Sequence, residues 1–349
     1  MILKDYGHGG DVYKNRVTLD FSANVNPFGT PEPVKAAIRA AAEDVSRYPD
    51  PYCTALRKKL AAITGVLPDE ILCGNGAAEL IFSFVQAVKP KSALLPVPSF
   101  AEYETALRTA GVEPVFEPLS RDSGFALSDR ILDSITPETD VLLLCSPNNP
   151  TGCSIGKELL LKILDRCRET GTWLFLDECF QDLTDADKAF SLIGSLWDGD
   201  RVLILKAFTK TYGMAGVRLG YAISKNRDLL RNMSEAVQPW NVSTLAQSAG
   251  LAALDCPDWA QKARELFRTE KAFLIKELSA LGVSVLYGDA NFLLLSGVPS
   301  LYERLLERGI LARDCANFRG LEKGDVRIAV RTHVENAALI AAITEALHA

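Results

Sequence analysis

The 349-residue chain lacks any unbroken apolar run of the roughly 20 residues that a membrane-spanning helix needs. Its opening residues contain no apolar core segment and no cleavage-site pattern, so no secretory signal peptide is predicted. The formal net charge is -6, with both signs interspersed, which argues against nucleic acid or an anionic membrane as the main partner. We therefore expect a cytoplasmic protein that acts on small molecules.

Histidine is scarce, and the cysteines lack the spacing of a metal site. The chain has 3 histidines, none of them near a cysteine in sequence, and its 8 cysteines form no Cys-x-x-Cys pair. These patterns disfavour a zinc site and a disulfide framework, and they favour buried, reduced thiols.

Short apolar runs alternate with amphipathic segments, which predicts an α/β fold with a mostly parallel sheet between helices. In such sheets, ligands bind beyond the carboxyl ends of the strands. The expected strands are 92–97, 141–145, 173–177, 201–208 and 219–223. The expected helices are 31–45, 77–88, 103–110 and 157–170.

The pattern changes after about residue 240, where long helices (259–281 and 335–348) flank short strands (291–295 and 326–330). We expect residues 46–238 to form a large domain. Residues 1–45 and 239–349 are expected to form an N-terminal arm and a smaller α/β domain. Thr30 followed by Pro31 is typical of an N-cap with proline at the first helical position.

The segment 206–221 has the strongest chemical pattern in the chain. Lys210 follows an apolar strand, and Arg218 comes eight positions later across a loop of small residues. Burial would disfavour the ammonium form of Lys210 and leave its amine available to a carbonyl. The small residues would let a flat ligand approach the backbone, and Arg218 could bind a phosphate.

Three further segments with polar or glycine residues lie at the ends of predicted strands or at the start of a predicted helix. Asp177 ends an apolar strand, and the segment 146–152 (Ser-Pro-Asn-Asn-Pro-Thr-Gly) follows another. Taken alone, Asp177 could be a helix cap or a member of a buried ion pair rather than a ligand-binding residue, and segment 146–152 could be an ordinary turn. The segment 73–79 lacks the Gly-Lys-Ser/Thr of a Walker loop, but its glycines expose backbone N–H groups at a helix N-terminus.

Together, and in this order, these segments resemble the fold-type-I pyridoxal 5'-phosphate (PLP) enzymes of the aspartate aminotransferase superfamily, over nearly the whole chain. The resemblance implies that Lys210 carries PLP as a Schiff base and that Asp177 keeps the ring nitrogen protonated. It also implies further cofactor contacts: Asn149 on the ring hydroxyl oxygen, Phe100 stacked on the ring, and Thr209, Arg218, Gly76 and Ala77 on the phosphate. Tyr48 would reach the phosphate of a neighbouring subunit, which implies a homodimer with shared active sites.

Two branches of the superfamily compete: L-threonine-O-3-phosphate decarboxylases of cobalamin biosynthesis and histidinol-phosphate aminotransferases. The decarboxylases are favoured by the N-terminal arm with His8, by the amino-acid sequences of segments 100–103 and 313–321, and by Phe180. Aminotransferases of this group usually have tyrosine at that last position. The resemblance implies that Arg327 binds the α-carboxylate, and that Arg313, His8 and Asn24 are candidates for a substrate phosphate.

The residues alone leave the reaction open. The bond perpendicular to the pyridine plane breaks, so one torsion decides between loss of CO2 and loss of the Cα proton, and sequence does not set that torsion. A non-catalytic PLP-sensing module attached to a DNA-binding domain is a further alternative. It is disfavoured by the negative charge and by the absence of a helix-turn-helix or basic arm. Arg331 is expected to be solvated.

Overall fold

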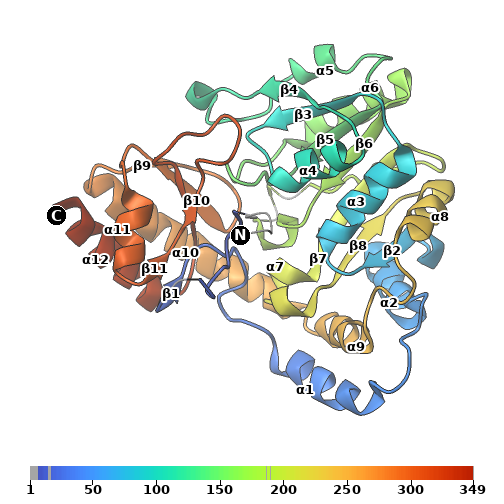
Figure 1. Ribbon diagram of the computed structural model, residues 1–349, viewed down its shortest axis with the longest axis horizontal. Helices are drawn as coiled ribbons and strands as arrows, with labels where there is room; N and C mark the ends of the chain where they lie inside the picture. The colour runs from blue at the N-terminus through green and yellow to red at the C-terminus, as the bar shows by residue number, and fades with distance from the viewer. Residues whose placement is uncertain (1–6, 15–16, 186, 189, 349) are drawn as a thin grey trace.

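The computed structural model describes residues 7–14, 17–185, 187–188 and 190–348, which form two lobes (Figure 1). The larger lobe contains a seven-stranded sheet whose central strands are all parallel, as the sequence predicts. Only β8 runs antiparallel, to both of its neighbours β2 and β7. The strand order is β2 (Ile71–Gly74), β8 (Gly220–Ile223), β7 (Val202–Ala207), β6 (Trp173–Asp177), β5 (Val141–Cys145), β3 (Ala93–Val97) and β4 (Val115–Pro118).

Helices cover both faces of this sheet, so its central strands are buried on both sides and consist of nearly continuous apolar residues. In β5, Leu142 and Leu144 face one hydrophobic cluster, while Val141 and Leu143 face the other. The helices of the lobe are α1 (Glu32–Ala41), α2 (Thr54–Thr64), α3 (Ala77–Val88), α4 (Ala101–Thr109), α5 (Ile131–Ser134), α6 (Lys157–Thr170), α7 (Phe208–Thr211), α8 (Arg227–Ala236) and α9 (Thr244–Ala253).

The predicted start of the first helix is wrong by one residue. Pro31 occupies the N-cap of α1, and no side chain caps the helix. The Thr30 hydroxyl instead donates to the carbonyl oxygen of Gly213 at 2.8 Å. The N-terminal segment is therefore attached to the loop that follows Lys210.

The smaller lobe is built on a four-stranded antiparallel sheet of order β12 (Arg313–Asp314), β13 (Val326–Ala329), β10 (Phe292–Ser296) and β9 (Ser284–Leu286). It also contains α10 (Asp258–Ala280), α11 (Leu301–Glu307) and α12 (His333–His348). Strand β1 (Leu19–Asp20) pairs with β11 (Ile310–Leu311), so the N-terminal stretch packs with this lobe. Helix α9 contributes Ala246 and Ala249 to the core of the larger lobe, and the domain boundary at residue 239 stays a prediction.

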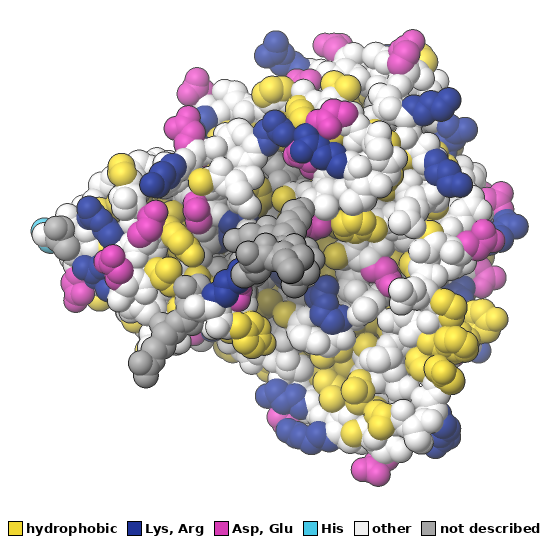
Figure 2. Space-filling model, in the orientation of Figure 1, with side chains coloured by type: hydrophobic (Ala, Val, Ile, Leu, Met, Phe, Trp, Pro, Cys, Tyr) yellow, Lys and Arg dark blue, Asp and Glu magenta, His cyan; other side chains and the backbone are white. Residues whose placement is uncertain are grey.

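Charged side chains of both signs are interspersed over the face seen in Figure 2. Even α10, which has 23 residues, carries many charged residues along its length. Across the part of the chain that the structure describes, we find no helix that is both long and apolar enough to cross a membrane.

Candidate active site

Lys210 and Asp177 meet at the carboxyl edge of the large sheet. Asp177 is the last residue of β6, and Lys210 lies in α7, which directly follows β7. Burial, together with the positive charges of Arg327 and Arg218, lowers the pKa of Lys210 to about 8, although Asp177 opposes the shift. Lys210 therefore supplies the neutral amine that a carbonyl requires more readily than a lysine with the ordinary pKa of 10.5.

Both carboxylate oxygens of Asp177 accept hydrogen bonds. The Tyr103 hydroxyl donates to Oδ2 at 2.7 Å, and the backbone N–H of Cys179 donates to Oδ1 at 2.8 Å. Burial raises the pKa of the Asp177 carboxyl, and these donors oppose that shift. Among the residues that the structure describes, no arginine pairs with this buried carboxylate, which therefore suits a cationic ring nitrogen.

An anion seat lies at the N-terminus of α3. Gly76 caps this 12-residue helix with φ 80°, and a Cβ atom there would come within 2.6 Å of the Arg218 guanidinium. A Cβ atom at Gly220 would lie 2.6 Å from the backbone nitrogen of Ala77. Gly76 is favoured by its positive φ and Gly220 by the close approach of backbone, and the guanidinium lies beside the N-terminus of the helix. Thr209 adjoins Lys210 in α7.

Aromatic and amide groups complete the site. The Lys210 Nζ atom lies 5.3 Å from the ring centroid of Phe180, which packs edge-on against Phe292. Phe100, at the N-cap of α4, packs edge-on against Tyr103. The side-chain oxygen of Asn149 accepts from Arg327. An amine, a buried acid, an aromatic ring and an anion seat form a donor set that fits PLP.

Two arginines from the smaller lobe lie opposite each other. Arg313 and Arg327 are cross-strand partners on β12 and β13, and both are more than nine-tenths buried. Burial lowers the pKa of Arg327 to about 10 and also lowers that of Arg313. Arg327 donates to the carbonyl oxygen of Ser22 at 2.8 Å, and its Nε lies 3.1 Å from the side-chain oxygen of Asn24 when that amide is oriented to accept. Arg313 donates to Asn317 at 2.7 Å.

The N-terminal arm approaches the same region. His8 Nε2 lies 2.8 Å from a carboxylate oxygen of Glu102, and its ring centroid lies 5.9 Å from that of Phe100. The Asn317 amide that contacts Arg313 also donates to the carbonyl oxygen of Gly7 at 3.3 Å. His8 is therefore near the Phe100 ring, and the adjacent Gly7 contacts the asparagine that binds Arg313.

Two residues considered from the sequence lie apart from this constellation within the chain. The Tyr48 side chain is 80% exposed and stacks on Trp240 with ring centroids 4.6 Å apart. Arg331 forms an ion pair with Glu335 of α12 at 2.7 Å, so it is engaged within the small lobe rather than solvated.

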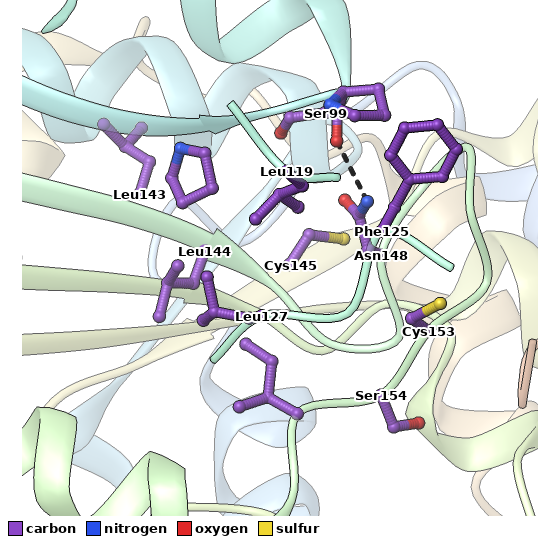
Figure 3. A pocket seen from close by; sticks show the side chains of 13 residues that line it. Ser99, Leu119, Phe125, Leu127, Leu143, Leu144, Cys145, Asn148, Cys153 and Ser154 are labelled. Carbon is purple, nitrogen blue, oxygen red and sulfur yellow. Dashed lines mark hydrogen bonds between the residues drawn. The ribbon is translucent and has the colours of Figure 1, made fainter. Parts of the chain in front are cut away.

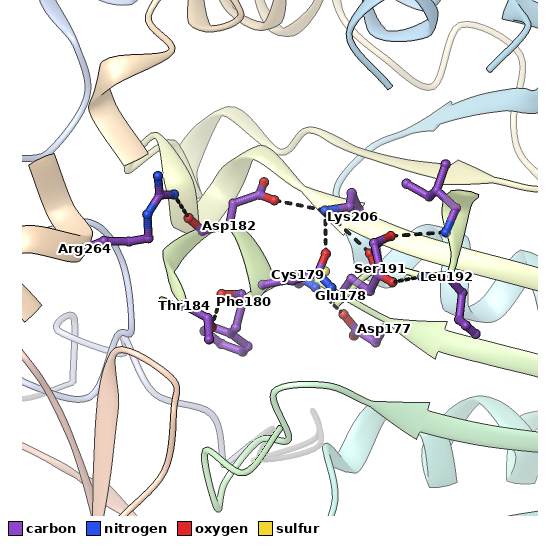
Figure 4. A network of polar contacts seen from close by, with 12 residues as sticks. Asp177, Glu178, Cys179, Phe180, Asp182, Thr184, Ser191, Leu192, Lys206 and Arg264 are labelled. Carbon is purple, nitrogen blue, oxygen red and sulfur yellow. Dashed lines mark hydrogen bonds and ion pairs between the residues drawn. The ribbon is translucent and has the colours of Figure 1, made fainter. Parts of the chain in front are cut away.

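The sequence reasoning missed a polar network that fixes the loop after Asp177 (Figure 4). The buried Lys206 ammonium lies 2.9 Å from Asp182 and 3.6 Å from Glu178, and the Ser191 hydroxyl donates to Glu178 at 2.8 Å. From α10, Arg264 donates to the carbonyl oxygen of Asp182 at 2.7 Å. A lysine inside an apolar strand needs a buried acid, and that signal was present in the sequence.

Two other contacts were also missed. Tyr103 binds Asp177 from 74 positions away in the chain, and the Asn26 backbone N–H donates to the carbonyl oxygen of Lys210 at 2.9 Å. The Asn26 side chain donates to the carbonyl oxygen of Thr211, also at 2.9 Å. Such partners are brought together only by the tertiary fold, so no local spacing indicates them.

A small cavity of about 20 Å³ lies behind the loop that carries Asn149 (Figure 3). Its lining is mainly apolar, and Asn148 crosses it to donate to the carbonyl oxygen of Pro98 at 3.0 Å. The buried Ser154 hydroxyl, which also lines it, has no hydrogen-bond partner among the described residues. The volume suits one water molecule rather than a substrate.

Comparison with known proteins agrees with this geometry. Residues 16–343 match the family model described as aminotransferase class I and II. Threonine-phosphate decarboxylase of Salmonella typhimurium is 37% identical, with 99% of this chain and 98% of that protein aligned. The crystal structure of the histidinol-phosphate aminotransferase from Clostridium acetobutylicum gives a TM-score of 0.88 at 28% identity, covering 95% of this chain and 99% of that one. The crystal structure of L-threonine-O-3-phosphate decarboxylase from Porphyromonas gingivalis gives a TM-score of 0.83 at 27% identity. The alignment covers 95% of this chain and 100% of that one.

Proposed function

The chain belongs to the aminotransferase class I and II family, whose cofactor is PLP, and we propose that it decarboxylates L-threonine O-3-phosphate for cobalamin biosynthesis. The single observation that carries this choice is the arginine pair. Two buried guanidinium groups directly opposite each other repel, so their arrangement favours a ligand with two anionic groups. A phosphorylated amino acid has a carboxylate and a phosphate.

We assign the cofactor contacts as follows. The Lys210 amine would hold PLP covalently, Asp177 would pair with the ring nitrogen, Asn149 would contact the ring oxygen, and Phe100 would stack on the ring. Gly76, Ala77, Thr209 and Arg218 hold the cofactor phosphate. When bound, PLP supplies an electron sink for the charge that develops at the substrate's α-carbon.

The remaining groups act on the substrate. We assign Arg327 to the α-carboxylate and Arg313, His8 and Asn24 to the substrate phosphate. Holding both ends of the substrate fixes the torsion at Cα, and with it which bond lies perpendicular to the ring. The Lys210 amine, with a pKa of about 8, is able to deliver a proton to Cα after CO2 has left.

Histidinol-phosphate aminotransferase is the alternative function, favoured by the TM-score of 0.88 to such an enzyme. Both functions require PLP and a phosphate site, so fold similarity does not separate them. Histidinol phosphate, however, has a phosphate and no carboxylate, so it lacks one of the two anionic groups that L-threonine O-3-phosphate offers to the arginine pair. The identity of 37% over nearly the full length also favours the decarboxylase.

A homodimer belongs to the same proposal. Tyr48 and Trp240 stack on each other while remaining 80% and 46% exposed, and Tyr52 is 71% exposed. Hydrophobic side chains gather in the region of α2 and α9 on the face seen in Figure 2. Exposed aromatic clusters of this kind are typical of protein interfaces. We assign this cluster to the subunit interface, from which Tyr48 would reach the partner's cofactor.

The deciding experiment supplies the PLP-loaded protein with L-threonine O-3-phosphate and no keto acid. Release of CO2 with formation of aminopropanol phosphate supports decarboxylation. Turnover that requires 2-oxoglutarate and yields glutamate would instead establish the aminotransferase. Histidinol phosphate with 2-oxoglutarate provides the matched comparison.

A further inference from the structure

The first turn of α4 brings two aromatic residues to the candidate cofactor site. Phe100 is the N-cap of the helix, and Tyr103 lies three positions later, so both side chains lie on one face. Tyr103 is fully buried, and its ring packs against Phe100 and Phe175 with centroids 5.6 Å and 5.9 Å away. This packing aims its hydroxyl at Asp177, which it reaches at 2.7 Å.

We propose that Tyr103 is a positioning residue that keeps Asp177 ionised and directed at the ring nitrogen of the cofactor. The proposal rests on the proposed PLP site and is independent of the choice of substrate. Among the contacts of Asp177, the Cys179 N–H comes from the same loop and fixes only Oδ1. The Tyr103 hydroxyl comes from a different element and fixes Oδ2, so the two donors together determine the plane of the carboxylate.

Three other groups face Asp177, and one of them, the Cys179 thiol, is a second side-chain donor to the carboxylate. They are the Cys145 thiol from β5, the Cys179 thiol and the Lys210 amine from α7. Burial raises the pKa of both thiols, so they stay neutral and weakly donating. Burial also raises the pKa of Tyr103, with the Asp177 charge adding to the effect, so this phenol remains protonated and able to donate to Asp177.

The consequence of removing the hydroxyl has a definite sign. Burial raises the pKa of Asp177, and the hydrogen bonds from the Cys179 side chain and from the Tyr103 hydroxyl lower it. Without the bond from Tyr103, the carboxyl takes up a proton at a higher pH. A neutral carboxyl no longer pairs with a cationic ring nitrogen, so the cofactor should be released at a higher pH on acidification.

Tyr103→Phe removes only the hydroxyl and tests this directly. We expect the pH at which half of the cofactor is released, followed by absorbance and equilibrium dialysis, to rise by about one unit. The control is Tyr221→Phe, another buried tyrosine, whose pKa is raised without any contribution from Asp177; its midpoint should match the wild type. A Tyr103→Phe midpoint equal to that of the wild type would overturn the proposal.

A double-mutant cycle separates this role from simple packing. In an Asp177→Asn background, Tyr103→Phe should leave the midpoint unchanged, because there is no longer a carboxylate to tune. An equal shift in both backgrounds would mean that Tyr103 acts only through packing. If Tyr103→Phe does not fold, 3-fluorotyrosine at position 103 gives a stronger donor and should lower the midpoint; no change there would also overturn the proposal. Failure of the wild-type protein to bind PLP at all would instead refute the proposed function.

Discussion

Arg313 and Arg327 occupy directly opposite positions on the antiparallel strands β12 and β13, with both side chains more than nine-tenths buried. Burial lowers the pKa of Arg327, and the positive charge of Arg313 adds to that shift. In this structure their partners are neutral oxygens, from Asn149 and Ser22 for Arg327 and from Asn317 for Arg313. Placing two cations together costs stability, which a substrate with two anionic groups would offset.

Arg313→Leu should therefore weaken binding of the phosphorylated substrate selectively. We expect KM for L-threonine O-3-phosphate to rise by about 100-fold, because truncating one member of a buried charge contact costs about 2–5 kcal/mol. Unphosphorylated L-threonine should be affected far less. Steady-state kinetics with both amino acids measure the difference.

The surface variant Arg39→Ala is the control for this experiment. Arg39 pairs with Glu32 on exposed α1, and such pairs contribute at most about 1 kcal/mol. If Arg313→Leu raised KM equally for both amino acids, Arg313 would stabilise the smaller lobe rather than bind the substrate phosphate.

Two lysines near the site, the half-buried Lys210 and the buried Lys206, should respond to substitution in opposite directions. Lys210 has a pKa lowered to about 8 by burial, against an ordinary 10.5. The unfolded chain therefore binds the extra proton between pH 8 and 10.5, and below pH 8 the buried ammonium opposes folding. Lys210→Met should raise the unfolding free energy of the cofactor-free protein at pH 7 by roughly 3 kcal/mol. This gain should vanish as the pH rises through 10.5.

Lys206→Met is the matched contrast. Its pKa is raised because Asp182 and Glu178 outweigh the cost of burial, so the ammonium stabilises the fold fully below pH 10.5. This variant should lose stability at pH 7 in urea denaturation of the cofactor-free protein. If both variants changed the unfolding free energy in the same direction, the assigned charge states would be wrong.

Much of the large lobe could be predicted from the sequence because its signals are local. Strands β5 and β6 and helices α3 and α6 have the predicted bounds, since buried apolar runs and helical periodicity mark them. Short edge elements such as β1, β11 and β12 were missed because each depends on a partner far along the chain. The Thr30 hydroxyl was misassigned for the same reason, as its acceptor lies 183 positions away.

The candidate site likewise contains residues that local motifs predict and contacts that depend on the tertiary structure. Lys210, Asp177, Asn149 and the anion seat at Gly76 lie in recognisable motifs, each at the end of a predicted strand or the start of a predicted helix. The contacts that orient them were not predictable. From sequence alone, Tyr103 is typical of a core aromatic residue and Asn26 of a turn residue. Only the tertiary structure places Tyr103 against Asp177 and Asn26 against Lys210.

Phe180→Tyr should alter the colour transition of the bound cofactor. Phe180 is buried, and its ring centroid lies 5.3 Å from the Lys210 amine. A tyrosine hydroxyl there could donate to the ring oxygen of the cofactor and favour its anionic form, so the pH midpoint of the absorbance change should fall. Spectrophotometric titration measures the midpoint. An unchanged midpoint would mean that position 180 does not contact the cofactor.

Gly213→Ala should disrupt the contact between the N-terminal segment and the Lys210 loop. Gly213 has φ 59°, and an added Cβ atom would lie 2.6 Å from the carbonyl carbon of Gly29. Backbone cannot move aside as a flexible side chain can, and an L-residue at this φ is itself strained. We expect the unfolding free energy to fall by about 2 kcal/mol or more, together with weaker cofactor retention, because Asn26 and Thr30 hold the same loop through its carbonyl oxygens.

Gly216→Ala, three residues further on, provides the control. A Cβ atom there meets nothing within 4 Å, so the variant should stay within about 0.5 kcal/mol of the wild type. Thermal or urea unfolding and equilibrium dialysis of the cofactor would compare the two. Equal behaviour of both variants would show that the N-terminal segment is not tightly held against the lysine loop. A loss confined to Gly213→Ala would establish that this segment supports the site from outside the large sheet.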